Sequence, residues 1–170
     1  MLEKLVPNQA VHRLTEVDVD ALVERGITTI LLDLDNTITS WRSLDVPDDL
    51  AAWVEEAKGK CRVCIVSNTS KMQRLDKLKE RMDLEAVGFA SKPWGFKKAM
   101  AKLDVKADEA IAIGDQLMTD VYGGNLAGCE TVLVKPVSND EFFGTYFIRL
   151  IERCCLGMLR RRGMFTRPWE

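Results

Sequence analysis

The chain of 170 residues contains a single histidine, His12, and no long hydrophobic run. One histidine in the N-terminal segment gives poor support to a catalytic triad that uses histidine as its base. No apolar run approaches the roughly 20 residues that a membrane-spanning helix requires, and the first residues lack the apolar core of a signal peptide. These absences predict a cytoplasmic protein.

The five cysteines lack the spacing of a zinc site or a redox pair. Cys61 and Cys64 form a Cys-x-x-Cys motif, but no second pair and no neighbouring histidine completes the four ligands that zinc usually takes. The motif lies within an expected strand and not at the start of a helix, where redox-active thiols gain reactivity. We interpret both residues as small buried side chains.

Apolar segments alternate with helical patterns along the chain, and the apolar segments have no polar face. Such strands are typical of a parallel sheet that is covered by helices on both sides. An N-terminal helix is expected to be capped by Thr15 and to end at Gly26. The pattern therefore predicts a single α/β domain over residues 1–170, with a three-layer open parallel sheet. We expect strands at about 27–33, 61–66, 86–90, 110–113 and 131–134, and helices at about 48–59, 71–81, 94–103 and 117–126.

A further helix is predicted at about 142–163, where apolar residues recur at helical spacing. Residues 149–170 hold six Arg and two Glu, so this end carries +4 and residues 1–148 carry −6. Two interpretations remain open. The helix packs on its own domain, or it lies as a basic amphipathic element on an anionic membrane or a partner. No nucleic-acid partner is expected. The expected stripe is Phe143, Phe147, Leu150, Ile151, Cys154 and Met158, with Arg149, Arg153 and Arg160 off it.

Two carboxylates follow the first expected strand, in the segment Asp33-Leu34-Asp35-Asn36-Thr37. Because side chains alternate along an extended chain, Asp33 and Asp35 point to the same side. Two carboxylates so close repel each other, and a hard cation such as Mg²⁺ relieves that repulsion well. Asp, Asn and Thr are also common after strands as turn formers, so this segment needs support from elsewhere in the chain.

Three further polar clusters supply that support, each after a later strand. Ligands bind beyond the carboxyl ends of the strands in an open parallel sheet, so we expect all four clusters to surround one pocket. The carboxylates suit Mg²⁺, whereas Ser67 and Lys92 suit phosphate oxygens. The later clusters are Ser67-Asn68-Thr69, Ser91-Lys92-Pro93, and Gly114-Asp115 with Thr119-Asp120.

In this order the clusters resemble the four motifs of haloacid dehalogenase-type (HAD) phosphatases, and more closely those of the bacterial YqeG-like subgroup. The subgroup's Leu5-Val6-Pro7-Asn8 and Ile151-Glu152-Arg153 segments are also present. The likeness covers nearly the whole chain and implies a HAD-type Rossmann-like core. The matching motifs are Asp33-Leu34-Asp35-Asn36-Thr37, Ser67-Asn68, Lys92-Pro93 and Gly114-Asp115-Gln116-Leu117-Met118-Thr119-Asp120.

The resemblance implies a mechanism for hydrolysis of a phosphomonoester. Asp33 would attack phosphorus and form an aspartyl-phosphate, and Asp35 would act as general acid and then as general base. Mg²⁺ would be held by the Asp33 carboxylate, the Asp35 backbone carbonyl and Asp115. Lys92 would neutralise charge on the phosphoryl group. Ser67, Asn68 and Thr37 would contact the substrate, with Thr37 also shaping its loop, and Asp120 would support the metal or position Lys92.

Many HAD enzymes carry a cap domain between the first and second motifs or between the second and third. Here those gaps are about 30 and 25 residues, which the core elements use up, so no cap is expected. An open pocket admits a bulky substrate whose own body closes the site. Relatives in this branch act on phosphatidylglycerophosphate, and the resemblance implies that substrate, at the inner membrane surface.

Two rival functions use the same residues. A low-activity phosphate-binding scaffold would recruit a partner or a membrane through the C-terminal helix, although inactive relatives tend to lose Asp33 or Asp35 first. A phospho-receiver domain also pairs an acidic pocket with a lysine, but it needs neither Asp35 nor the spacing of Asp115 and Asp120.

Overall fold

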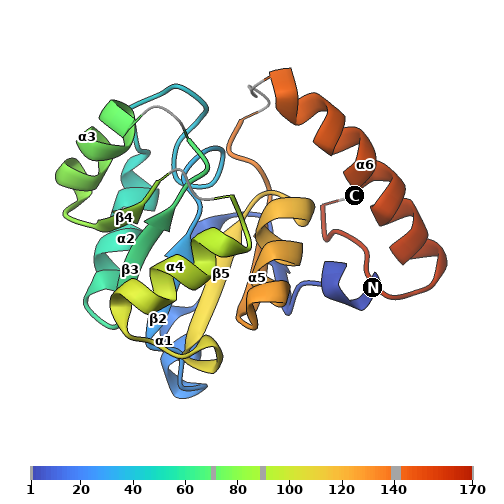
Figure 1. Cartoon of the computed structure of the whole chain (residues 1–170), viewed down its shortest axis with the longest axis horizontal. Helices are drawn as coiled ribbons and strands as arrows, with labels where there is room; N and C mark the ends of the chain where they lie inside the picture. The colour runs from blue at the N-terminus through green and yellow to red at the C-terminus, as the bar shows by residue number, and fades with distance from the viewer. Residues whose placement is uncertain (1, 70–71, 89–90, 139–142, 170) are drawn as a thin grey trace.

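The computed structural model describes residues 2–69, 72–88, 91–138 and 143–169 (Figure 1). Its centre is one six-stranded sheet with the strand order β1-β6-β5-β2-β3-β4. Every neighbouring pair of strands is parallel, which confirms the predicted α/β class. The strands are β1 (Gln9–Val11), β2 (Thr29–Leu32), β3 (Arg62–Val66), β4 (Glu85–Val87), β5 (Ala110–Gly114) and β6 (Glu130–Val134).

Helices cover both faces of this sheet (Figure 1). The α-helices are α1 (Val19–Glu24), α2 (Asp48–Lys58), α3 (Met72–Met82), α4 (Trp94–Leu103), α5 (Tyr122–Ala127) and α6 (Phe143–Arg161). Shorter turns of 3₁₀-helix are η1 (Leu2–Leu5), η2 (Leu14–Glu16) and η3 (Ala107–Glu109), and η4 (Leu117–Val121) is a π-helical turn.

The alternation of side chains along the central strands explains why these segments are apolar throughout. On β2, Ile30 and Leu32 lie in the core cluster with Trp53 and Val54 of α2, whereas Leu31 lies in the cluster on the other face with Phe96 of α4. Each of these side chains is at most 5% exposed. Burial on both faces provides the main driving force for the three-layer arrangement.

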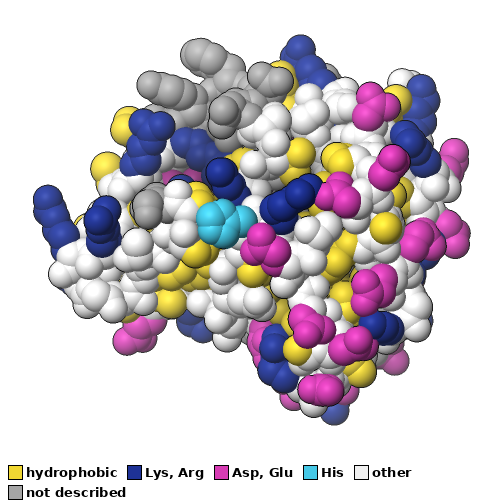
Figure 2. All heavy atoms as spheres, turned by 180° about the vertical axis from the view of Figure 1, so that it is seen from behind, with side chains coloured by type: hydrophobic (Ala, Val, Ile, Leu, Met, Phe, Trp, Pro, Cys, Tyr) yellow, Lys and Arg dark blue, Asp and Glu magenta, His cyan; other side chains and the backbone are white. Residues whose placement is uncertain are grey.

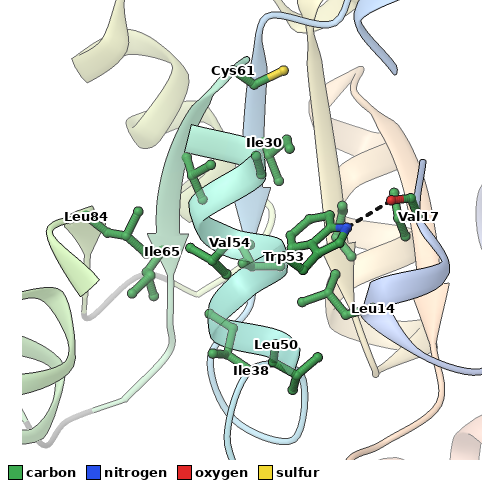
Figure 3. Close-up of a cluster of buried hydrophobic side chains, with 14 of the residues drawn as sticks. Leu14, Val17, Ile30, Ile38, Leu50, Trp53, Val54, Cys61, Ile65 and Leu84 are labelled. Carbon is green, nitrogen blue, oxygen red and sulfur yellow. Dashed lines mark hydrogen bonds between the residues drawn. The ribbon is translucent and has the colours of Figure 1, made fainter. Parts of the chain in front are cut away.

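Figure 3 shows the first of these clusters, in which the indole of Trp53 also finds a polar partner. Trp53 Nε1 donates a hydrogen bond of 2.9 Å to the Val17 carbonyl, so the buried N–H is satisfied. Cys61 belongs to this cluster, and Cys64 belongs to the other. Burial raises the pKa of the Cys64 thiol to about 11. The interpretation of both cysteines as buried core residues is confirmed.

The N-terminal segment differs from the expectation in two respects. Strand β1 was not predicted, because three residues give too short a pattern. It is fixed to β6 by Asn8, whose side-chain oxygen accepts a 2.8 Å hydrogen bond from Thr131 N. The expected cap at Thr15 is wrong: Asp18 caps α1 by accepting from Ala21 N at 3.1 Å. Gly26 ends this segment with a φ of 88°, which favours glycine.

The C-terminal helix α6 forms as predicted but presents a different face to the domain. Leu156 and Leu159 are buried, together with the carboxylate of Glu152. Leu150 is 51% exposed and Met158 is 44% exposed, so the predicted apolar stripe is not the buried face where the structure describes it. The side chains of Phe143 and Phe147 lie outside the described residues. The helix therefore packs on its own domain, as one of the two open interpretations expected, but it does so through Glu152, Leu156 and Leu159. Contact of the exposed stripe with a membrane or a partner stays a prediction.

Candidate active site

The four predicted motifs follow strands β2, β3, β4 and β5 at one edge of the sheet. Asp33 continues β2, since its backbone N–H donates to the Ile113 carbonyl at 2.9 Å. Ser67 continues β3 in the same way, with its N–H on the Val87 carbonyl at 3.0 Å. Asp115 comes directly after β5. The parallel register therefore brings side chains from distant parts of the sequence to the same end of the sheet.

The loop after β2 is tightly folded around Asp33. Asn36 has a φ of 63°, a left-handed conformation that Asn tolerates better than most residues, and its N–H donates to the Thr39 carbonyl at 2.7 Å. This turn buries Thr37, whose hydroxyl donates to Asp33 Oδ2 at 3.5 Å. Thr37 therefore contacts the predicted nucleophile directly.

Lys92 lies between the carboxylate of Asp33, which follows β2, and that of Asp120, which lies in η4. Its ammonium group forms ion pairs with Asp33 and with Asp120, and its side chain is only 3% exposed. Burial opposes the positive charge, but Asp120 and Asp33 outweigh it and raise the pKa of Lys92 above its usual value. Lys92 is therefore a permanent cation beside Asp33. The sequence left two roles open for Asp120, support of the metal or positioning of Lys92. The ion pair between Asp120 and Lys92 favours the second role.

The π-helical turn η4 directs Asp120 back toward β5. Asp120 Oδ2 accepts from Gln116 N at 2.9 Å, and its carboxyl group lies against Gly114, where an added Cβ would be 2.2 Å from Asp120 Cγ. The wide π turn and the absent side chain at Gly114 together allow this approach. Irregular π turns of this kind are frequent at functional sites.

Three carboxylates thus gather at the sheet edge, from Asp33, Asp115 and Asp120. One oxygen of each lies within 4.8 Å of the others, and all three residues are buried. Burial raises the pKa of Asp33 to about 7, with Lys92 lowering it and Asp120 and Asp35 raising it. Burial likewise raises the pKa of Asp115 well above its usual value, against the influence of Arg149. Burial thus favours the neutral form of Asp33 and of Asp115 in the absence of a metal ion.

These oxygens fit a hard divalent cation. Asp115 Oδ1 is buried and has no hydrogen-bond partner among the described residues, although buried carboxylate oxygens are normally satisfied. Oxygen ligands at this spacing, with an orphaned acceptor among them, are the donor set that Mg²⁺ prefers. Two of the predicted metal ligands, Asp33 and Asp115, belong to this group of carboxylates. The side chain of Asp35 does not belong to it, which agrees with the expectation that Asp35 would bind the metal through its backbone carbonyl alone.

Asp35 instead binds Arg74 of α3, a residue that the sequence did not single out. Arg74 Nη1 donates to Asp35 Oδ1 at 2.7 Å, and Nε donates to the Ser43 carbonyl at 2.8 Å. The Arg74 side chain is 10% exposed. Arg74 thus ties α3 to Asp35, the predicted acid and base, and to the rest of the loop after β2. Only its place on the polar side of an expected helix hinted at this.

The remaining predicted residues lie beside the carboxylates. Ser67 is buried, and its hydroxyl accepts from Thr69 N at 3.2 Å. Asn68 is exposed at the end of β3. Ser67 and its loop therefore line the same sheet edge as Asp33, with Asn68 open to solvent.

A second arginine reaches the site from α6. Arg149 forms an ion pair with Asp115 Oδ2, and its Nη1 donates to the Asp115 carbonyl at 3.1 Å and to Glu152 Oε2 at 2.9 Å. The Glu152 carboxylate also accepts from Met118 N at 3.1 Å. Sequence reasoning placed Arg149 off the apolar stripe and missed this role. The i,i+3 pairing of Arg149 with Glu152 is the signal that could have indicated it.

Comparisons with known proteins show what the chain is similar to. A family profile described as HAD-hydrolase-like matches residues 90–138, which include Lys92, Asp115 and Asp120. Among solved structures, the cobalt-bound deoxy-D-mannose-octulosonate 8-phosphate phosphatase of Haemophilus influenzae superposes with a TM-score of 0.51 at 14% identity. The match covers 78% of this chain and 89% of that one. At this identity the likeness concerns the fold alone.

Sequence relatives are more specific. The chain is 36% identical to "Probable phosphatase YqeG" of Bacillus subtilis, over 100% of this chain and 99% of that protein. It is 28% identical to the chloroplastic/mitochondrial phosphatidylglycerophosphate phosphatase 1 of Arabidopsis thaliana, over 92% of this chain but 48% of that protein. The chain belongs to the YqeG-like phosphatases of the HAD superfamily.

Proposed function

We propose that the chain is a Mg²⁺-dependent phosphomonoester hydrolase that works through an aspartyl-phosphate on Asp33. The observation that carries this proposal is the buried group of Asp33, Asp115 and Asp120 around the ammonium of Lys92. Bound Mg²⁺ would supply positive charge to the phosphoryl oxygens and to the carboxylates, with Asp33, the Asp35 carbonyl and Asp115 as its protein ligands.

Each residue then has a distinct task. Asp33 attacks phosphorus, while Lys92 binds a phosphoryl oxygen as charge develops on it. Asp35 gives a proton to the leaving oxygen and later takes one from the attacking water. The hydrogen bond from Arg74 holds the Asp35 carboxylate in one orientation. The hydroxyl of Ser67, the side chain of Asn68 and the nearby backbone N–H groups hold the remaining phosphate oxygens, and Thr37 supports Asp33.

The substrate we propose is phosphatidylglycerophosphate or another phosphate at a membrane surface. The match to a phosphatidylglycerophosphate phosphatase supports this choice, and so does our prediction that the chain carries no cap. Between β2 and β3 the chain forms a loop and α2, and the described residues between β3 and β4 form α3. A single domain without a cap would leave the site open to a bulky lipid headgroup.

Helix α6 has the surface that peripheral binding to an anionic membrane requires. Leu150, Ile151 and Met158 are exposed large apolar side chains, and they share one helical face by their spacing. Arg153 and Arg160 are exposed beside them. On the face drawn in Figure 2, Lys and Arg side chains gather on the side of α6. Among the described residues no helix is long and apolar enough to span a bilayer. We propose a cytoplasmic protein that binds the inner membrane surface.

The decisive experiment compares phosphate release from phosphatidylglycerophosphate in vesicles with release from a soluble aryl phosphate. We expect Mg²⁺-dependent turnover of both, with the lipid preferred. The variant Asp33→Asn should lose turnover of both substrates and retain its fold, as checked by circular dichroism. Lys79→Gln on the exposed side of α3 is the control. Undiminished turnover by Asp33→Asn would remove Asp33 as nucleophile, and a lack of lipid turnover beside aryl phosphate turnover would refute the substrate.

A further inference from the structure

A cation supplied by the chain itself already occupies one side of the candidate metal ligand Asp115. Arg149 forms an ion pair with Oδ2 of Asp115 and also donates to its carbonyl. Oδ1 of the same carboxylate is buried and without a hydrogen-bond partner among the described residues. The two oxygens of Asp115 thus differ: one is neutralised by arginine, and the other remains available for a metal ion.

Electrostatics sets Arg149 against a metal ion at that position. A divalent ion on Asp115 would lie within a few ångströms of the guanidinium, and like charges at such distances repel strongly in a site shielded from water. The Arg149 side chain is 16% exposed and that of Asp115 is 0% exposed, so solvent screens this repulsion little. Arg149 therefore stabilises Asp115 without metal and disfavours the metal-bound state.

The same arginine connects Asp115 to the C-terminal helix. Glu152 accepts from Arg149 at 2.9 Å and from Met118 N at 3.1 Å, and Arg167 lies 3.7 Å from it. Leu156 and Leu159 continue this contact as an apolar cluster with Leu117 and Val121 of η4. Figure 1 shows α6 along the side of the molecule remote from α3. The polar contact of α6 through Arg149 thus depends on Asp115, which is also a proposed ligand of the metal ion.

We propose that Arg149 is an internal competitor for the divalent cation at Asp115, and that metal binding loosens α6 from the catalytic edge of the sheet. The inference depends on the proposed function only through the metal site. It assigns Arg149 a positioning role, because the residue acts through Asp115 and not on the phosphate itself. It also makes the position of α6 responsive to occupancy of the metal site.

The first test measures metal affinity directly, with no substrate present. Mn²⁺ replaces Mg²⁺ as the probe, and free Mn²⁺ is followed by electron paramagnetic resonance. Arg149→Gln should bind Mn²⁺ about tenfold more tightly than the wild-type chain, since a neighbouring positive charge is removed. Arg153→Gln on the exposed face of α6 removes the same charge from the chain and should leave the affinity unchanged. Equal affinities in Arg149→Gln and Arg153→Gln, or weaker binding in Arg149→Gln, would overturn the proposal.

A second measurement needs no variant and so does not depend on the folding of Arg149→Gln. Amide hydrogen exchange of the wild-type chain is compared with and without saturating Mg²⁺. Exchange in α6 should become faster with Mg²⁺, while exchange in α2 stays unchanged. Unchanged or slower exchange in α6 would overturn the coupling.

The outcomes separate this inference from the proposed function. If Mg²⁺ and Mn²⁺ have the effects described but no phosphoester is hydrolysed, only the phosphatase proposal fails. If phosphoesters are hydrolysed but these effects are absent, only the role of Arg149 is refuted.

Discussion

Arg74 and Asp35 are 39 positions apart in sequence and form a 2.7 Å ion pair in which the arginine side chain is 10% exposed. The same guanidinium also donates to the Ser40 and Ser43 carbonyls. Arg74 thereby joins α3 to the loop that follows β2 and fixes the direction of the predicted acid and base. Proton transfer requires hydrogen-bond geometry, so positioning of Asp35 should matter for catalysis.

Replacement of Arg74 by glutamine should lower kcat by about 10²-fold, which is the lower end of what a positioned general acid contributes. Metal affinity should change little, because the proposed metal contact of Asp35 is its backbone carbonyl and not its side chain. Exchange of amides in residues 40–43 should become faster. Lys77→Gln, on the exposed side of the same helix, is the control. A kcat equal to that of Lys77→Gln would contradict the role of Arg74.

The close contact between Gly114 and Asp120 gives a prediction about stability. An added Cβ at Gly114 would lie 2.3 Å from Asp120 Oδ2, so Gly114→Ala must push Asp120 away from Lys92. We expect a loss of about 1–3 kcal/mol in the free energy of unfolding, the usual cost of overpacking, and a large loss of turnover. Urea unfolding measures the change in the free energy of unfolding.

The matched control is Gly157→Ala in α6, where an added Cβ meets no atom within 4 Å. Alanine there should increase stability by about 0.5–1 kcal/mol, because glycine is unfavourable inside a helix. Destabilisation by both variants to a similar extent would show that the contact with Asp120 is not the cause.

The sequence was sufficient to predict the sheet and the sequence positions of the acidic side chains. Asp33 and Asp115 were correctly expected at strand ends because continuous apolar runs mark buried parallel strands. Arg74 and Arg149 could not be predicted in the same way. Each reaches the site from a helix, and the direction of a long side chain depends on tertiary packing that local spacing does not encode. The buried face of α6 was missed for the same reason, since Glu152 and Arg149 are polar.

The raised pKa of Asp33 should make stability depend on pH in the absence of metal. Burial moves this pKa from 3.8 to about 7, so between these values the folded chain holds a proton that the unfolded chain releases. The resulting stabilisation is complete at low pH and is lost as the pH rises through about 7. Urea unfolding in the presence of a chelator should show this decline. Asp33→Asn should show a shallower decline over the same range, and an identical slope in both chains would contradict the assignment.

Metal binding should lower the pKa of Asp33, which burial raises. A cation bound to Asp33 and Asp115 requires both carboxylates to be ionised, so binding releases protons wherever the metal-free groups are protonated. Calorimetry at pH 6 in two buffers of different ionisation enthalpy should detect release of at least part of one proton per metal ion. The part of this release that comes from Asp33 should decrease as the pH rises above about 7. Binding without proton release at pH 6 would show that Asp33 and Asp115 are already ionised.

The exposed apolar face of α6 gives a prediction about membrane binding. The double variant Leu150→Gln and Ile151→Gln should reduce binding to phosphatidylglycerol vesicles by about tenfold or more, because two side chains lose the favourable transfer from water. The matched control is Val23→Gln on α1, since Val23 is 43% exposed and apolar but lies on a different helix. Cosedimentation measures the bound fraction. Binding by the wild-type chain should also weaken as salt increases, because Arg153 and Arg160 contribute through their charge. Equal binding by the double variant and the control would mean that α6 does not contact the lipid.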